Sequence, residues 1–174
     1  MVVTQARQHG IALTSLFDEE VAEATVNTYR TLFDRIPAMW HWLDRLLRLV
    51  LMNDQSQELQ LGPVILMPKR IYLPNGLFLR YDDPAEDLWG GKLFENICQA
   101  LARVIIMQAA LRLADRGLRF VLQVHDELLF CIPAGEVEEA RVTIVQEMTK
   151  PPAWMPDLPL AVEVRTGDDY GGCV

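Results

Sequence analysis

The sequence predicts an α+β fold, with a small antiparallel sheet packed against long helices and a helical hairpin at the N-terminus. Apolar residues recur with helical spacing over residues 15–34, 37–50 and 92–116. Between and after these segments lie short apolar runs bounded by turn signals, which is the pattern of antiparallel strands. Helices set against short antiparallel strands form an α+β architecture.

Two helices are expected within residues 1–60. The first covers residues 15–34, where Ser15 and Asp18 form a capping-box pattern before an amphipathic stretch. Pro37 suits the first turn of a second helix, which runs through Val50. We expect the two helices to fold back on each other as a helical hairpin.

Residues 61–90 are expected to form an antiparallel β hairpin and a loop. The run LGPVILMPKRIYLPNGLFLRYDD is apolar in pieces, which are separated at Pro68-Lys69 and at Pro74-Asn75-Gly76. Pro-Asn-Gly is a strong turn signal, so the pieces are typical of short antiparallel strands. The segment DPAEDLWGG then forms a loop.

The longest helix opens the last region, residues 91–174. It runs from about Lys92 to Arg116 and ends at Gly117, because glycine is favoured just after a helix. The residues expected on its apolar side are Leu93, Ile97, Leu101, Ile105 and Leu111.

A second hairpin follows this helix. Its strands cover residues 118–124 and 128–132, on either side of a His-Asp-Glu triplet. A helix over residues 136–149 comes next, then an extended connection and a last strand, LAVEV, at 160–164.

The chain is acidic, with 24 acidic side chains, 16 basic ones and a net charge of −8. This sign opposes the binding of nucleic acid by bulk attraction, which needs Lys and Arg against the phosphates. A role on nucleic acid would therefore be confined to a local surface, or shared with a more basic partner.

Targeting and redox signals are weak. Cys98, Cys131 and Cys173 are spread out and show no zinc-binding spacing, which indicates reduced thiols. The N-terminus lacks the apolar core of a signal peptide, and no apolar run approaches the roughly 20 residues of a membrane span. We therefore expect a soluble, cytoplasmic protein with no membrane partner.

The triplet His125-Asp126-Glu127 interrupts the apolar run FVLQVHDELLF. Burial of an uncompensated carboxylate costs several kcal/mol, so such a group usually finds a partner or a metal. At the tip of a hairpin, Asp126 and Glu127 offer the hard oxygen ligands that magnesium prefers, and we expect them to be partly buried. The alternative is an ordinary polar turn, in which Asp is a favoured residue.

A polar stripe marks the long helix. Lys92, Asn96, Gln99 and Arg103 are spaced by 4, 3 and 4 residues, which places all four on one helical face. Two basic groups with two amides between them suit a surface that holds phosphates and base or sugar edges. A solvated helix face gives the same pattern, and the spacing alone does not separate the two alternatives.

These segments together resemble one protein family. LQVHDELLF, with ENICQALAR before it and GEVEEA and LPLAVEV after it, resembles the C-terminal palm of family A DNA polymerases, the DNA polymerase I class. GGKLFENICQALAR is most similar to the bacteriophage members, and the resemblance extends from about residue 4 to residue 170. It implies a palm sheet whose hairpin carries motif C.

The resemblance implies roles for the triplet. Asp126 matches the motif C aspartate that binds the catalytic magnesium ions, and Glu127 matches the acid beside it. His125 matches a histidine that contacts the primer terminus. The implied cofactor is two magnesium ions, with manganese as a substitute.

The resemblance also implies that the long helix contacts DNA. Gln99 matches a glutamine at the minor groove of the primer–template, and Asn96 matches a nearby asparagine. Lys92 stands where many members have arginine, so it can meet a phosphate but not in a bidentate way. With Arg103, these residues are the predicted DNA-binding set.

Parts of a complete polymerase are missing from the sequence. Motif A, which supplies the second metal-binding aspartate, and motif B, which holds the incoming nucleotide, do not appear, and there is no room for a thumb. We therefore expect a partner chain that supplies these parts, and the initial Met suggests a separately encoded subunit. The implied substrates are primer–template DNA and dNTPs, in the cytoplasm of a bacterial host.

Two other interpretations stay open. A non-catalytic DNA-binding or regulatory module, or a prophage remnant, would retain the palm fold without synthesis. A nuclease or other metal hydrolase would combine Asp126 and Glu127 with the tail acids Asp168 and Asp169.

Overall fold

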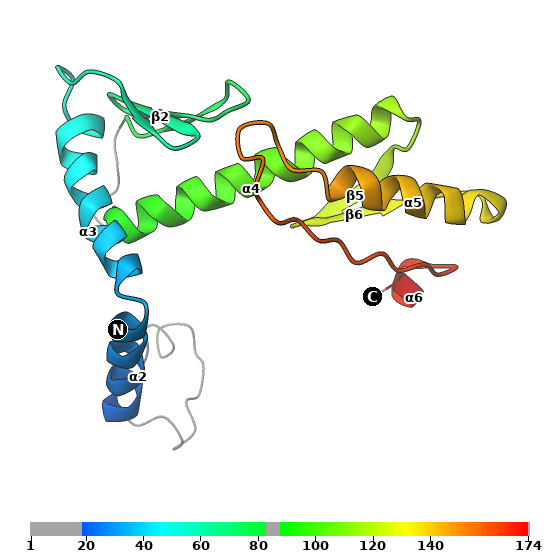
Figure 1. Ribbon diagram of the computed structural model, residues 1–174, viewed down its shortest axis with the longest axis horizontal. Helices are drawn as coiled ribbons and strands as arrows, with labels where there is room; N and C mark the ends of the chain where they lie inside the picture. The colour runs from blue at the N-terminus through cyan, green and yellow to red at the C-terminus, as the bar shows by residue number, and fades with distance from the viewer. Residues whose placement is uncertain (1–18, 83–87, 174) are drawn as a thin grey trace.

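The computed structural model describes residues 19–82 and 88–173. The molecule is elongated, because one long helix, α4 (Gly90–Asp115), joins two groups of elements (Figure 1). The α+β class predicted from the sequence is confirmed. The N-terminal group consists of α2 (Glu19–Leu32), α3 (Arg35–Leu46), the π-helical turn η1 (Leu47–Leu51) and the strands β1 (Leu59–Leu61), β2 (Val64–Met67), β3 (Arg70–Tyr72) and β4 (Phe78–Arg80).

The four strands of the N-terminal group form an antiparallel sheet in the order β1-β2-β3-β4. The predicted Pro-Asn-Gly turn joins β3 to β4, where Gly76 has a φ of +83°, a left-handed conformation that glycine adopts without strain. The Leu73 N–H closes the turn by donating to the Leu77 carbonyl over 2.7 Å. The turn predicted from the sequence is therefore confirmed.

The main hydrophobic core lies between this sheet, α3 and the first turns of α4. Val64 and Leu66 alternate along β2, so both point to the same face, and each is at most 1% exposed. Leu93 and Ile97 of α4 pack into the same cluster, as the apolar spacing of that helix predicted. Gly90, the first residue of α4, is buried against the backbone of α3.

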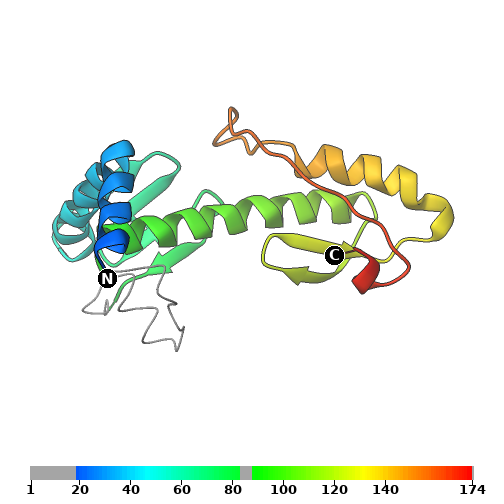
Figure 2. The ribbon, with the colours of Figure 1, turned by 90° about the horizontal axis from the view of Figure 1, so that it is seen from below.

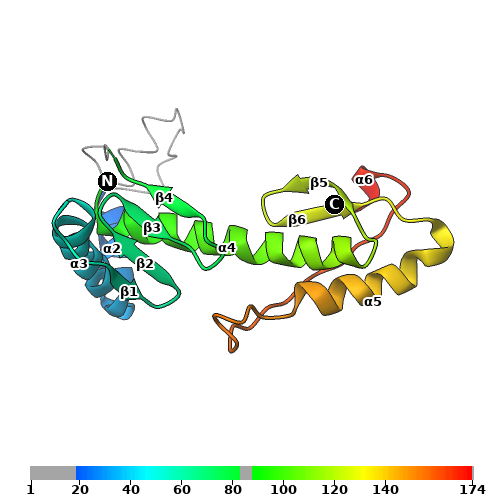
Figure 3. The same ribbon diagram turned by 90° about the horizontal axis from the view of Figure 1, so that it is seen from above.

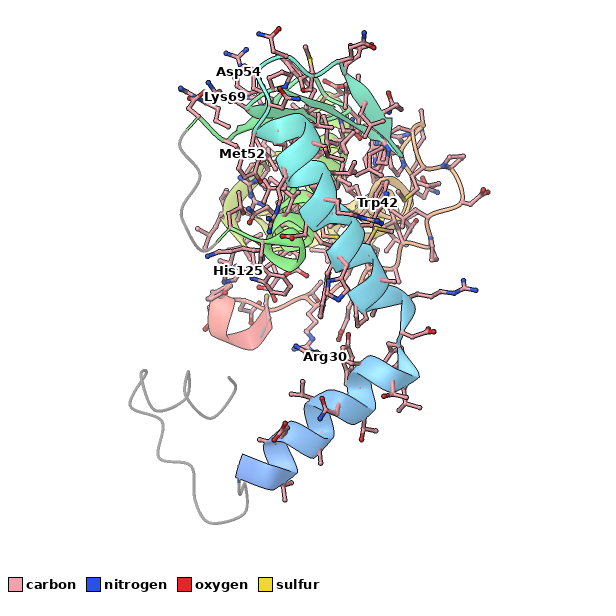
Figure 4. All side chains as sticks on the ribbon, turned by 90° about the vertical axis from the view of Figure 1, so that its left-hand side faces the viewer. Arg30, Trp42, Met52, Asp54, Lys69 and His125 are labelled. Atoms are coloured by element: carbon pink, nitrogen blue, oxygen red, sulfur yellow. The ribbon has the colours of Figure 1, made fainter. Side chains whose placement is uncertain are left out.

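The predicted N-terminal helical hairpin is wrong in its geometry. Both helices form, but α2 extends away from α3 and does not fold back along it (Figure 4). The reason lies in the connection, where Asp34 is itself in the right-handed helical region. Helical hydrogen bonds from Phe33 to Tyr29 and from Ile36 to Phe33 carry the chain onward without reversing it. As a result, Leu32 is 72% exposed.

The C-terminal group is built along the second half of α4. Gly117 ends the helix as predicted, with a φ of +87° and hydrogen bonds that return the chain to Leu113 and Ala114. The hairpin and α5 lie on opposite sides of α4 (Figures 2 and 3). The elements of this group are β5 (Phe120–Val124), β6 (Glu127–Phe130), the 3₁₀ turn η2 (Ala134–Glu136), α5 (Val137–Met148) and α6 (Tyr170–Cys173).

Three expectations for this group are wrong. Residues 160–164 are extended but pair with no strand among the described residues, because the second sheet consists of β5 and β6 alone. The strands of the hairpin, which looked buried from their sequence, are largely open, with Val121 60% and Leu122 46% exposed. Leu111 of α4, expected on the apolar side, is also exposed at 62%.

α5 is fixed to α4 by a carboxylate between two arginines. Glu147 is only 5% exposed. Its Oε2 accepts a hydrogen bond from Arg112 Nε over 2.9 Å, and its Oε1 lies 2.6 Å from Arg116 Nη2. Arg112 also donates to the Glu147 carbonyl over 2.6 Å. This network satisfies a charge that would otherwise be costly to bury.

Glu147→Ala should lower the free energy of unfolding by about 2 kcal/mol, because it leaves two arginines without their shared acceptor and opens space under α5. Urea unfolding of the two proteins measures the difference. Glu138→Ala is the matched control on the same helix, since Glu138 is 83% exposed and lies 3.9 Å from Arg141, and it should change stability by less than about 0.5 kcal/mol. Equal stability of the two variants would contradict this account.

α4 is also the one helix, among the described residues, with the length and apolar composition to cross a membrane. This corrects the expectation that no segment approaches such a span. Core helices of soluble proteins pass the same test, and α4 packs against α3 and α5. The composition of α4 alone is therefore weak evidence for a membrane.

Candidate functional site

The candidate site is the tip of the β5–β6 hairpin. Val124 pairs with Glu127 and Gln123 with Leu128, so His125 and Asp126 form a two-residue turn. The Gln123 side-chain amide steadies the turn by donating to the His125 carbonyl over 3.1 Å. The hairpin and its turn were predicted from the sequence.

His125 holds a conformation that is unusual for its residue type. Its φ is +50°, in the left-handed region, at a turn position where hairpins favour glycine. Non-glycine residues in this region are uncommon, although His is found there more often than most, and the rest of the structure must compensate for the cost in free energy. Lys69, in the turn between β2 and β3, has a similar φ of +60°.

Asp126 and Glu127 are both exposed at this tip. The expectation that they would be partly buried is therefore wrong for the described structure, because no described element covers the end of the hairpin. Their adjacent carboxylates supply hard oxygen donors of the kind that magnesium binds. The described residues contain no group of three or more His, Cys, Asp or Glu that could hold a metal ion. The pair therefore fits part of a magnesium ligand set.

The polar stripe on α4 is present as the spacing predicted. Lys92, Gln99 and Arg103 are exposed, while Asn96 is half-buried. The Gln99 amide donates to Glu95 Oε1 over 3.0 Å, an exposed contact one turn away on the same helix.

Asn96 has a structural contact that the sequence did not predict. Its amide donates to the hydroxyl of Tyr81 over 3.2 Å, and so ties α4 to the end of β4. Burial raises the pKa of Tyr81, and the hydrogen bond from Asn96 opposes this rise. Asn96 therefore has a role in the fold, whatever it contacts outside the chain.

The hairpin runs back along α4, so its tip lies beside the middle of that helix (Figures 2 and 3). Figure 4 shows His125 beside α4 and far from the ion pair of Asp54 and Lys69, which lies at the turn between β2 and β3. Asp169, one of the tail acids, accepts a hydrogen bond from the Gly172 N–H over 2.8 Å.

The segment that contains this site matches a known family. Residues 97–172, from the third turn of α4 through the hairpin and α5 to the tail, match the model of DNA polymerase family A. Residues 97–172 are therefore similar to a segment of family A DNA polymerases. The resemblance inferred from the residues around the His-Asp-Glu turn is thereby confirmed.

Similar proteins extend this match. The chain is 28% identical to a DNA polymerase of Bacillus phage SP02 over 191 aligned residues, which is 94% of this chain and 29% of the relative. It is 26% identical to a thermostable DNA polymerase I of Thermus filiformis, over 88% of this chain and 17% of the relative. A DNA polymerase I of Mycobacterium leprae is 37% identical over 39% of this chain and 7% of the relative.

The chain therefore spans less than a third of the length of these relatives, at 29%, 17% and 7%. The search of solved structures gave no match.

Proposed function

We propose that this chain is the C-terminal palm part of a phage-type family A DNA-directed DNA polymerase. It takes part in adding dNTPs to the 3′ end of a primer, together with a polypeptide that supplies motif A, motif B and the thumb. The observation that carries the proposal is the strained His125 turn, which presents Asp126 and Glu127 to solvent within the segment that matches the family. The reaction takes place in the cytoplasm of a bacterial host.

Each residue of the turn has a proposed role. Asp126 and Glu127 would hold the magnesium ions, with a further carboxylate from motif A. When bound, the ions neutralise charge on the transferring phosphoryl group and activate the primer hydroxyl. His125 can donate a hydrogen bond to a phosphate oxygen of the primer terminus. The exposed side of α4 positions the duplex through Lys92 and Arg103, while Gln99 meets the minor groove.

The surface of the chain supports assembly with another polypeptide. Val121, Leu122 and Leu111 are between 46% and 62% exposed on the C-terminal group. Large apolar side chains that stay open to solvent are candidates for contact with another polypeptide. The chain also has a net charge of −8, so most of the Lys and Arg side chains that bind the DNA phosphates would come from that partner. Both observations agree with a polymerase active site divided between this chain and other residues.

Primer extension tests the proposal. The chain is combined with the polypeptide of the same organism that carries motifs A and B, and incorporation of dNTPs is measured on a primer–template with magnesium. We expect template-directed incorporation by the mixture and none by this chain alone. Extension by this chain alone would contradict the division of the active site.

A non-catalytic DNA-binding module is the second candidate, and the exposed polar stripe on α4 favours it, because the stripe can bind a duplex without any chemistry. The same assay separates the two functions. A module of this kind would bind primer–template and give no incorporation in the mixture.

Gln99→Ala should weaken binding of primer–template by the assembled complex by roughly tenfold, which is the cost of losing one hydrogen bond to a tightly held group. Stability should not change, since the Gln99 contact with Glu95 is exposed. Gln146→Ala, an exposed glutamine on α5, is the matched control. Equal affinities of the two variants in an anisotropy titration would show that the stripe is only a solvated helix face.

A further inference from the structure

The outer face of β3 and β4 presents two arginines and two aromatic rings. The antiparallel register pairs Arg70 with Arg80 and Tyr72 with Phe78. Because residues two apart on a strand point to the same side, all four share one face of the sheet. Ile71 lies between the two residues of β3 and is fully buried on the opposite face. We call this set the β3–β4 outer face: Arg70, Tyr72, Phe78 and Arg80.

The planar groups of this face already pack against one another, with the rings of Tyr72 and Phe78 tilted by 46°. The guanidinium carbon of Arg70 lies 4.8 Å from the centroid of the Phe78 ring. The rings of Tyr72 and Phe78 are 5.3 Å apart between centroids, and Arg70 Nη1 lies 3.4 Å from the Tyr72 hydroxyl. Phe78 nevertheless remains 40% exposed. A preformed row of planar groups that stays open to solvent offers a stacking surface at little cost in side-chain entropy.

The charges of the face point to an anionic ligand. Arg70 forms no salt bridge with any residue that the structure describes, and its contacts are with the two rings instead. Lys69 comes directly before it and is 43% exposed, although it contacts Asp54. The chain as a whole is acidic, so a local cluster of cations is the exception on its surface.

We propose that the β3–β4 outer face binds single-stranded nucleic acid, with bases stacked on the rings of Tyr72 and Phe78 and phosphates held by Arg70 and Arg80. A single strand offers both groups that this face can take, since its bases are free to stack and its phosphates are anionic. A duplex keeps its bases stacked inside, and an acidic peptide has no flat rings for the aromatic residues. The inference does not depend on the proposed function, because it concerns a different sheet from the β5–β6 hairpin.

A substitution at Asp82 tests the proposal through an increase in affinity for a single strand. Arg80 donates to Asp82 Oδ2 from Nε over 2.9 Å and from Nη2 as well, so the carboxylate competes with a phosphate for this guanidinium. Asp82→Asn removes the competing charge. Because exposed ion pairs contribute at most about 1 kcal/mol, the variant should bind a single strand roughly two- to fivefold more tightly. Loss of folded structure could not produce such a gain.

The main experiment is an anisotropy titration of the full chain against fluorescein-labelled dT20 at low salt. Phe78→Ala should weaken binding by roughly five- to hundredfold, because it removes a stacked base, and Phe78→Trp should retain binding. Val121→Ala is the matched control, since Val121 is an apolar residue 60% exposed on the other sheet. Arg70→Ala should weaken binding and reduce the slope of log K against log salt by about 1.

The inference fails if the wild-type chain does not bind dT20 at low salt, or if Phe78→Ala binds as tightly as Val121→Ala. It also fails if a ten-residue glutamate peptide, or duplex of the same sequence length, displaces labelled dT20 as well as unlabelled dT20 does. In these last two cases the face would bind by charge alone. Because the titration measures binding without synthesis, its outcome is independent of the primer-extension test of the proposed function.

Discussion

Gly90→Ala should destabilise the chain by about 3 kcal/mol or more, although alanine is the better helix former. A Cβ added at Gly90 would lie 1.8 Å from the Trp40 carbonyl oxygen and 2.7 Å from the Asp44 nitrogen. Both neighbours are backbone atoms of α3, which cannot rotate away as a side chain can. The Gly90 N–H also donates to Asp44 Oδ1 over 3.2 Å, and this bond would be lost as the helices separate.

The effect of Gly90→Ala should extend to the whole N-terminal group, because the main core lies between α3, the sheet and the start of α4. Thermal unfolding followed by circular dichroism measures it, with an expected decrease in Tm of roughly 6–12 °C for a chain of this size. Gly135→Ala is the control, since a Cβ there meets nothing within 4 Å. If both variants melt at the same temperature, α3 and α4 do not approach as closely as described.

Asp126→Asn should reduce incorporation by the assembled polymerase by about a thousandfold or more, because it removes the charge of a proposed ligand of the catalytic ions. The amide has nearly the same shape, and Asp126 is exposed at a turn that tolerates Asn well. The isolated chain should therefore keep its stability within about 0.5 kcal/mol. Asp157→Asn, another exposed aspartate, is the control for both measurements.

A large decrease in the Tm of Asp126→Asn would contradict this assignment, since it would make Asp126 a turn residue that holds the hairpin together. Unchanged incorporation by the complex that contains Asp126→Asn would also contradict the assignment of Asp126 as a metal ligand. A loss of synthesis without a loss of stability is the pattern expected of a carboxylate kept for function.

Local signals in the sequence were sufficient for the turns and helix ends. Gly76 and Gly117 both hold left-handed backbone that few other residues adopt, so their positions identified a turn and a helix end without any tertiary information. The His-Asp-Glu turn could also be predicted from local sequence, because the segments on both sides of it are apolar.

Features that depend on residues distant in the chain could not be predicted from the sequence. The path of α2 depends on Phe33 and Asp34 continuing the helical hydrogen bonds, which residue propensities do not determine. Residues 160–164 have the composition of a strand, but a strand also needs a neighbour to pair with. Glu147 lies 35 residues from Arg112 in the chain, and no local pattern indicates that the two side chains pair.

The position of the candidate site in a hairpin turn was predicted, but its surroundings were not. The sequence placed Asp126 and Glu127 in a turn between apolar strands, which suggested partial burial. In the structure both are exposed, and apolar residues beside them such as Val124 are exposed as well, at 37%. Residues outside this chain would cover these strands in the proposed complex, and a single sequence does not contain them.

The central claim is that this chain completes a polymerase active site through the carboxylates of its hairpin. Magnesium-dependent incorporation of a single dNTP tests it most directly, with one complex that contains the wild-type chain and another that contains Asp126→Asn, at equal extents of assembly. The account predicts incorporation by the wild-type complex and a rate about a thousandfold lower, or none, for the variant. Equal rates for the two complexes would show that the hairpin carboxylate does not take part in the chemistry.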